Sequence, residues 1–191
     1  MAYTTVNDPS VYFQTKIYTG NGTDGTAISG VGFQPDWIWI KERSSTSDHG
    51  LYDAVRGANK HLEANKTTAE DSATNQLSSF DTDGFTLGDS GLTNEDDETY
   101  VAWNWKANGS GSANTAGSIN TAATSANTTS GFSIITYTGN GSSGATIGHG
   151  LSTAPQAVFI KKRTAANWTV GHVGVGWTKN GKLNTVDSFG V

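Results

Sequence analysis

The stretch Tyr18–Arg43, YTGNGTDGTAISGVGFQPDWIWIKER, predicts the fold class, because it joins a glycine-rich turn to an aromatic strand. Its residues Gly20, Gly22 and Gly25 satisfy the G-x-G-x-x-G pattern of dinucleotide sites. In such a site a helix follows the glycines, and its N-terminus holds the pyrophosphate. The residues that follow here are rich in glycine, proline and β-branched side chains without a helical period, so we predict a hairpin turn instead.

The same pattern recurs later in the chain as YTGNGSSGATI, followed by FIKKR. Tyr18 corresponds to Tyr137 and Arg43 to Arg163, an offset of 119 or 120 residues. A period of this length is too long for a solenoid repeat and indicates tandem domains. Both occurrences of the motif follow a predicted strand and precede residues without a helical period. The motif is therefore more typical of a repeated hairpin than of a nucleotide site.

The repeat divides the chain into four segments. We expect an N-terminal arm over residues 1–11, a β-sandwich domain over 12–107, a linker over 108–131 and a second copy of the domain over 132–191. The linker is rich in Gly, Ser, Thr, Asn and Ala, carries no charge and has one large apolar residue, Ile119. Such a composition favours a flexible or extended spacer without a core.

The second copy is shorter than the first. It has no counterpart to the segment Phe80–Lys106, which includes the strand YVAWNWK. A sandwich without these strands exposes unpaired main-chain groups. We therefore expect the second domain to be truncated, as part of a longer protein, or completed by strands of another chain.

The fold class that follows is all-β, with tandem antiparallel β-sandwiches of jelly-roll or lectin-like type. Short segments such as YFQTKIYT, DWIWIKE, TYVAWNWK and FSIITYT are rich in β-branched and aromatic residues and end at turn-forming residues. The chain has no cysteine, so disulfides and thiolate metal sites are excluded. It shows neither a signal-peptide pattern nor an apolar run long enough to span a membrane.

Charge is distributed unevenly between the two copies. Residues 1–107 hold 16 acidic and 7 basic side chains, whereas residues 108–191 hold one acidic and 5 basic side chains. The two parts of the chain thus carry net charges of opposite sign, which argues against a nucleic-acid-binding protein. They permit head-to-tail contacts between copies of the chain.

Two W-x-W pairs, Trp37 with Trp39 and Trp103 with Trp105, each place both indoles on one face of a strand. Each pair forms either a stacking platform for sugar rings or part of a sandwich core. In the second copy alanine and phenylalanine replace the first pair, so the position stays apolar and we interpret that pair as core. The second pair has no counterpart, and Trp103 and Trp105 remain candidate ligand-binding residues.

Lys41 and Arg43 recur as Lys161 and Arg163 at the end of the second strand. Lys41 and Arg43 are candidates for contact with an acidic sugar or a partner protein. The alternative is that they are solvated charges that limit pairing at a strand end.

Clustered carboxylates suggest a calcium site as a second type of site. Asp81, Asp83 and Asp89 are the candidate ligands, because DTDG resembles the start of a calcium loop. The EF-hand's third acidic position and closing glutamate are absent, which favours a turn with solvated acids. Paired-acid catalysis common to both copies is excluded, since the second copy has only Asp187, and the four histidines show no metal-binding spacing.

The segments YTGNGT, SFDTDGFTLG and TYVAWNWKA, followed by GFSIITYTGNGSSG, resemble a domain of marine bacteriophage (cyanophage-like) structural proteins. The resemblance implies concanavalin-A-like or pentraxin-like β-sandwiches in tail fibres and virion appendages. It defines no catalytic residues.

The resemblance leads us to expect a non-enzymatic virion protein, made in the host cytoplasm. It would act as a tail-fibre or appendage module that presents lectin-like surfaces for attachment. Its expected partners are other virion proteins, copies of itself and a host surface glycan. No cofactor is expected, and a calcium ion at the clustered carboxylates is the alternative. A capsid decoration (cement) protein is the alternative, and a glycan-degrading fibre enzyme is the third hypothesis.

Overall fold

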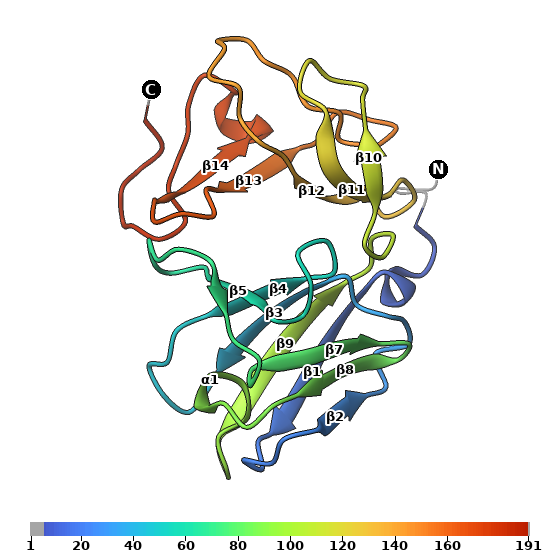
Figure 1. Ribbon diagram of the computed structural model, residues 1–191, viewed down its shortest axis with the longest axis vertical. Helices are drawn as coiled ribbons and strands as arrows, with labels where there is room; N and C mark the ends of the chain where they lie inside the picture. The colour runs from blue at the N-terminus through green and yellow to red at the C-terminus, as the bar shows by residue number, and fades with distance from the viewer. Residues whose placement is uncertain (1–5, 191) are drawn as a thin grey trace.

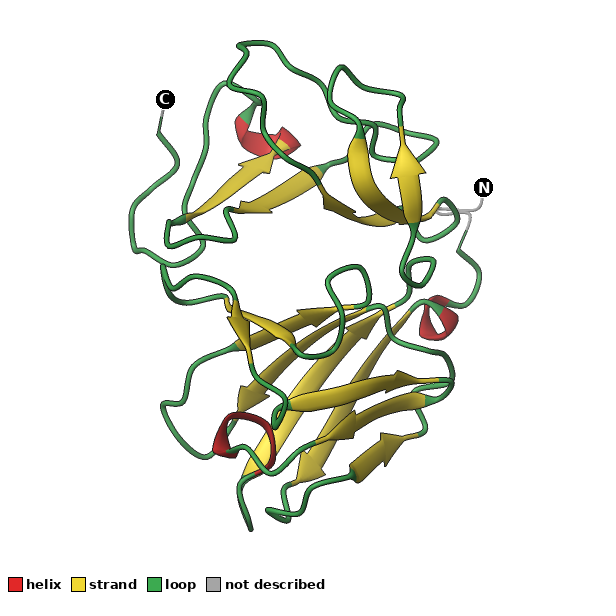
Figure 2. Cartoon of the chain, viewed as in Figure 1, coloured by secondary structure: helices red, strands yellow, loops and turns green. Residues whose placement is uncertain are grey.

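The computed structural model describes residues 6–190 and has two halves, one above the other in Figure 1. We call residues 6–107 the N-terminal half and residues 108–190 the C-terminal half. Figure 2 shows that the regular secondary structure of both halves is mainly β-strand, with long loops in the C-terminal half. The helical segments are one turn each: η1 (Pro9–Val11), α1 (Gly91–Asn94) and η2 (Val173–Val175). None of the helices in the described part of the chain is long and apolar enough to cross a membrane.

The N-terminal half is built on a six-stranded antiparallel sheet. Its strands, in spatial order, are β1 (Phe13–Thr19), β9 (Thr99–Trp105), β3 (Trp37–Glu42), β4 (Gly50–Asp53), β5 (Lys60–Glu63) and β6 (Asp71–Ser72). Burial alternates residue by residue along β9 and β3, as expected for strands with two different faces. The sheet therefore has an inner and an outer face.

A second, three-stranded sheet covers the inner face. Its order is β2 (Thr26–Ser29), β8 (Gly84–Leu87) and β7 (Leu77–Asp81). Ile38 and Ile40 of β3 pack against Phe85 and Leu87 of β8, and all four are fully buried. The N-terminal half is thus a two-layered antiparallel sandwich, and its all-β class agrees with the sequence prediction.

The C-terminal half contains two small sheets rather than a complete sandwich. One has the order β10 (Ser112–Asn114), β11 (Thr121–Asn127) and β12 (Phe132–Thr136), and the other pairs β13 (Ala157–Lys161) with β14 (Trp168–His172). In the repeat, β12, β13 and β14 correspond to β1, β3 and β4. No strand described here corresponds to β7, β8 or β9.

The prediction of a flexible or extended linker over residues 108–131 needs correction, because this segment contains the strands β10 and β11. Thr121 and Thr124 are buried and their hydroxyl groups hydrogen-bond at 2.8 Å. Ser125 is fully buried and its Oγ accepts a hydrogen bond from the Asn108 N–H at 2.8 Å. Small hydroxyl side chains satisfy one another here, which a search for large apolar residues could not detect. Of the expected arm, residues 1–5 lie outside the described residues, and the end of it forms η1.

The two glycine-rich turns have the same conformation. Asn21 Oδ1 accepts from the Thr23 N–H at 3.0 Å, and Asn140 Oδ1 accepts from the Ser142 N–H at the same distance. Gly22, which follows Asn21, has φ = 60°, in the region that favours glycine. The turn is confirmed, but it does not close a hairpin: β1 pairs with β9 and β2 with β8, so the turn carries the chain from one sheet to the other.

Candidate functional site

The outer face of the six-stranded sheet carries the aromatic residues that the sequence analysis singled out. Trp37 lies directly opposite Trp105, and Trp39 directly opposite Trp103. Both W-x-W pairs therefore share one face, as strand alternation predicts. We call these four residues, together with Phe13 of β1, the aromatic face.

One end of the aromatic face lies against the C-terminal half. The ring centroids of Trp37 and Trp105 are 4.5 Å apart, and those of Phe13 and Trp105 are 4.8 Å apart. Phe132 of β12 covers this pair, with centroids 5.7 Å from Trp37 and 6.1 Å from Trp105. Aromatic pairs of this kind contribute about 0.5–1.5 kcal/mol each beyond the area they bury.

A second apolar cluster holds the two halves together beside these rings. Trp168 of β14 is 6% exposed and packs with Leu51, Leu62 and Ala64, and Trp37 and Trp39 lie against this group. The indole N–H of Trp168 donates to the Glu63 carbonyl at 2.8 Å, so its only polar atom is satisfied.

These contacts correct the interpretation of Trp37 and Trp39 as sandwich core. Both are packed, but between the two halves rather than between the two sheets. Trp105 joins them there, covered by Phe132.

Trp103 lies at the open end of the aromatic face. Its one aromatic partner among the described residues is Trp39, edge-on with centroids 5.9 Å apart. Thr15 of β1 lies opposite Trp103 and is exposed, and the next residue on that face, Ile17, is 64% exposed. Of the four tryptophans, Trp103 is the one with apolar and hydroxyl groups exposed beside it.

The imidazole of His49, the residue before β4, supports Trp39 of the aromatic face. The Trp39 indole N–H donates to His49 Nδ1 at 2.9 Å. Burial lowers the pKa of His49, and the charge of Lys41 lowers it further. A neutral imidazole has the free Nδ1 lone pair that this hydrogen bond needs. The sequence pattern gave no signal for His49 beyond its type.

Lys41 and Arg43 lie on the same strand face beyond Trp39. The Lys41 ammonium donates to the carbonyls of Glu42 and Ser45, and Lys161 repeats this contact with Lys162 and Thr164. Lys41 therefore first stabilises its own loop. Arg43 is exposed, and its side chain has no hydrogen bond to the described residues.

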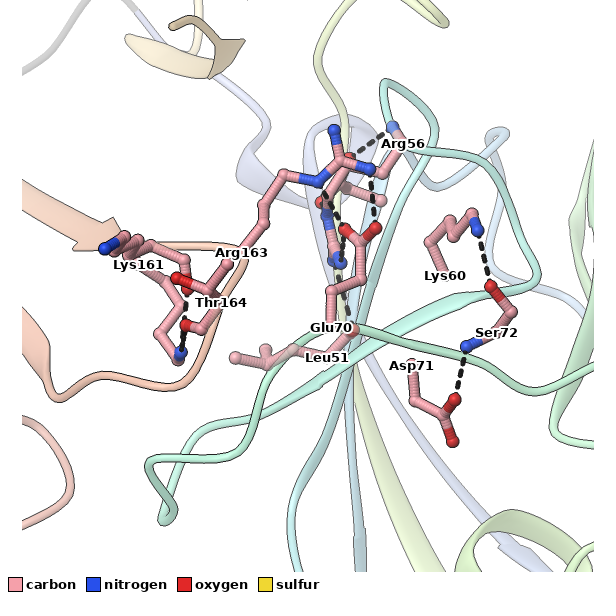
Figure 3. Close-up of polar contacts among 11 residues, drawn as sticks. Leu51, Arg56, Lys60, Glu70, Asp71, Ser72, Lys161, Arg163 and Thr164 are labelled. Atoms are coloured by element: carbon pink, nitrogen blue, oxygen red, sulfur yellow. Dashed lines mark hydrogen bonds and ion pairs between the residues drawn. The ribbon is translucent and has the colours of Figure 1, made fainter. Parts of the chain in front are cut away.

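Arg163, the repeat counterpart of Arg43, joins the two halves through Glu70 (Figure 3). Its Nη2 lies 2.5 Å from Glu70 Oε1 and its Nε 2.9 Å from Oε2. Arg56 donates to the same carboxylate at 3.2 Å and to Asp53 at 2.5 Å. The Glu70 N–H also donates to the Arg163 carbonyl at 2.8 Å. The sequence analysis missed Glu70, because nothing along the chain marks an acid whose partners lie in the other copy.

From the ion pairs of Glu70 we predict that the contact between the two halves is less stable at acidic pH. Burial acts to raise the pKa of Glu70, but hydrogen bonds and charges from Arg163 and Arg56 outweigh it, and the pKa lies below its usual value. The stabilisation is therefore complete above the usual glutamate pKa of about 4.3 and is lost as the pH falls through the lower folded value. We expect Glu70→Gln to cost about 2 kcal/mol at pH 7 and less near pH 3.

Urea denaturation of both proteins at pH 7 and at about pH 3 measures this difference. Asp187→Asn is the control, because Asp187 is 62% exposed, pairs with Lys182 at 3.5 Å and contributes little. An equal loss for Glu70→Gln at both pH values would show that the carboxylate charge has no role in docking.

Two of the three candidate calcium ligands, Asp81 and Asp83, accept hydrogen bonds within the N-terminal half. Asp83 accepts from the N–H groups of Gly30 at 3.0 Å and Gly32 at 2.5 Å, and these hydrogen bonds lower its pKa. Asp81 accepts from two hydroxyl groups, and Asp89 is exposed. Within residues 6–190 no three His, Asp or Glu side chains are grouped as a metal would require. Calcium binding, the alternative to a turn with solvated acids, is not tested by this arrangement.

Comparison with known proteins gives one match. Residues 8–190 match the family described as Domain of unknown function (DUF7483). No curated protein and no solved structure matches the chain.

Proposed function

The chain belongs to the DUF7483 family of unknown function, and we propose that it is a non-enzymatic structural protein of a bacteriophage virion. In this proposal it is a tail-fibre or appendage module with lectin-like β-sandwich domains, and the open end of the aromatic face binds a host surface glycan. The resemblance of its repeated motifs to marine phage structural proteins supports the virion part. The placement of Trp103 supports the glycan part.

Trp103 is the single observation that carries the glycan proposal. The flat apolar side of a pyranose ring stacks on an indole, and polar groups at the rim orient its hydroxyl groups. At the open end, Thr15 offers a hydroxyl group directly opposite Trp103. Lys41 lies one step along, opposite Val101, and two of its three N–H donors are used within its own loop. The antiparallel sheet beneath holds these groups in fixed positions.

A glycan array probed with the full chain tests this proposal. We expect binding to at least one glycan class and a loss of about tenfold in affinity for Trp103→Ala. A tenfold change corresponds to about 1.4 kcal/mol, which is within the range of one aromatic stacking contact. Trp177→Ala is the matched control, because Trp177 is 54% exposed and lies in the C-terminal half.

Circular dichroism of each variant shows whether the fold is intact. A blank array, or equal binding by Trp103→Ala and the wild type, would refute the glycan proposal. Release of reducing sugar by the purified chain would refute the non-enzymatic part.

A capsid decoration protein is the second candidate. It is favoured by the exposed apolar side chains of the C-terminal half, which could bind other virion subunits. Eight of the eleven large apolar side chains that are exposed within the described residues lie there: Tyr137, Phe159, Ile160, Val173, Val175, Trp177, Val186 and Phe189. Copy number per particle separates the two candidates, since hundreds of copies indicate decoration and a few tens indicate a fibre or appendage.

A further inference from the structure

The strand β13 has a hydrogen-bonded neighbour on one side, β14. Val170 of β14 exchanges both main-chain hydrogen bonds with Gly181 on its far side, at 2.8 and 2.9 Å. Phe159 lies opposite Val170, and antiparallel residues paired in this way turn their N–H and C=O groups away from each other. The main chain of Phe159 therefore points to the other edge, where the described residues give it no partner.

The repeat shows what normally fills this edge. Phe159 corresponds to Trp39 of β3. The Arg43 N–H donates to the Thr99 carbonyl at 2.6 Å, so alternate residues back along β3, including Trp39, turn their main chains toward β9. The open edge of β13 is thus the edge that β9 occupies on β3, and it is shaped to accept an antiparallel strand.

A second open edge lies on β1, at the end of the six-stranded sheet. The Tyr12 carbonyl accepts from the Lys106 N–H, and the Gly20 N–H donates to the Glu98 carbonyl, both at 2.8 Å. Even-numbered residues of β1 therefore face β9, and Ile17 turns its main chain outward. An edge strand with exposed apolar side chains is a template for pairing with another chain.

We propose that β1 of one copy of this chain pairs with β13 of a second copy. Ile17 and Phe159 both direct their main chains into the new junction, and both side chains lie on the face that carries the tryptophans. Paired residues of this kind have Cα atoms about 5.5 Å apart, so the two side chains contact each other. They are 64% and 51% exposed in the single chain, and the junction covers both.

The charges of the two halves favour this arrangement. β1 belongs to the half with 16 acidic and 7 basic residues, and β13 to the half with 5 basic residues and one acidic residue. Head-to-tail pairing brings opposite signs together, whereas pairing β1 with β1 or β13 with β13 brings like signs together. Because the two surfaces differ, the contact repeats from copy to copy and builds a ring or a filament. This inference does not depend on glycan binding.

Two edge variants of the full chain test the proposal by sedimentation velocity. Ile17→Lys and Phe159→Lys each place a charge on one edge at an exposed position, which blocks pairing with little effect on the fold. Val186→Lys is the control, since Val186 is fully exposed and lies on neither strand. We expect the wild type and Val186→Lys to form larger assemblies as the protein concentration rises. Each edge variant alone should assemble with an affinity at least about tenfold lower.

Mixing the two edge variants gives the sharpest result. Ile17→Lys keeps an intact β13 edge and Phe159→Lys an intact β1 edge, so the mixture forms a one-to-one dimer that cannot grow. A wild type that remains monomeric at high concentration overturns the proposal, and capture of a synthetic peptide of residues 99–106 by that monomer would assign the edge to a β9-like strand of another protein. Dimerisation of either variant alone as strong as that of the wild type also overturns it, because it indicates pairing of like edges.

Discussion

Replacing Trp168 by alanine is expected to lower the free energy of unfolding by about 3–5 kcal/mol and to release the C-terminal half from the N-terminal half. The indole is 6% exposed and fills the space between Leu51, Leu62 and Ala64. Its removal leaves a cavity among residues that belong to a rigid sheet and cannot close around it. It also leaves the Glu63 carbonyl without its donor.

Hydrogen exchange and urea denaturation measure the two parts of this expectation. Exchange should rise mainly over residues 108–190, because the N-terminal sandwich keeps its own core. Trp168→Phe restores most of the apolar volume without the N–H, so its loss should be smaller. Trp177→Ala, at a 54% exposed position of the same half, is the control. Unchanged exchange in Trp168→Ala would mean that this residue does not hold the halves together.

Asn94→Leu is expected to cost about 2–4 kcal/mol, the second largest effect, by releasing the turn that follows β1. Asn94 is fully buried and its side chain holds three partners. Its Oδ1 accepts from the Asn21 N–H at 3.0 Å, and its Nδ2 donates to the carbonyls of Thr23 at 3.0 Å and Gly88 at 2.8 Å. Leucine has a similar volume and satisfies none of them, and the Gly88 carbonyl is too buried for water to replace the bond.

Thermal and urea denaturation measure the Asn94→Leu effect. Asn120→Leu is a matched control, because Asn120 is exposed and has no hydrogen bond in the described structure. Exchange at Asn21 and Thr23 should rise in Asn94→Leu ahead of global unfolding. A stability equal to that of the control would show that the turn is held by its own Asx hydrogen bond alone.

Local patterns predicted the all-β class, the repeat and the common face of the two tryptophans within each W-x-W pair. Alternation along a strand is fixed by its geometry, so two W-x-W pairs on neighbouring strands point the same way once the strands pair. What covers that face depends on residues far along the chain. Phe132 and Trp168 arrive from the second copy, and neither carries a local sign of its partner.

Besides the placement of Trp37 and Trp39, two sequence predictions needed correction, and both relied on local signals alone. A search for large apolar residues assigned residues 108–131 to a linker, although buried hydroxyl groups such as Thr121 and Thr124 organise β11. The prediction of a hairpin at the glycine-rich turn also relied on a local motif alone. A turn between two sheets has the same residues as a turn within one, and only the pairing of β1 with β9 and of β2 with β8 separates them.

The repeated turn also offers a place to attach a probe. At Gly20 an added side chain would lie 2.1 Å from the Glu95 carbonyl, so this glycine is confined by the loop before β9. Its counterpart Gly139 has no atom within 4 Å of the same position, and no loop confines it. Because the chain has no cysteine, Gly139→Cys provides a unique thiol for a fluorophore or a gold particle. Such a label reports the position of the protein in any assembly it forms, without disturbing the tryptophans or either open edge.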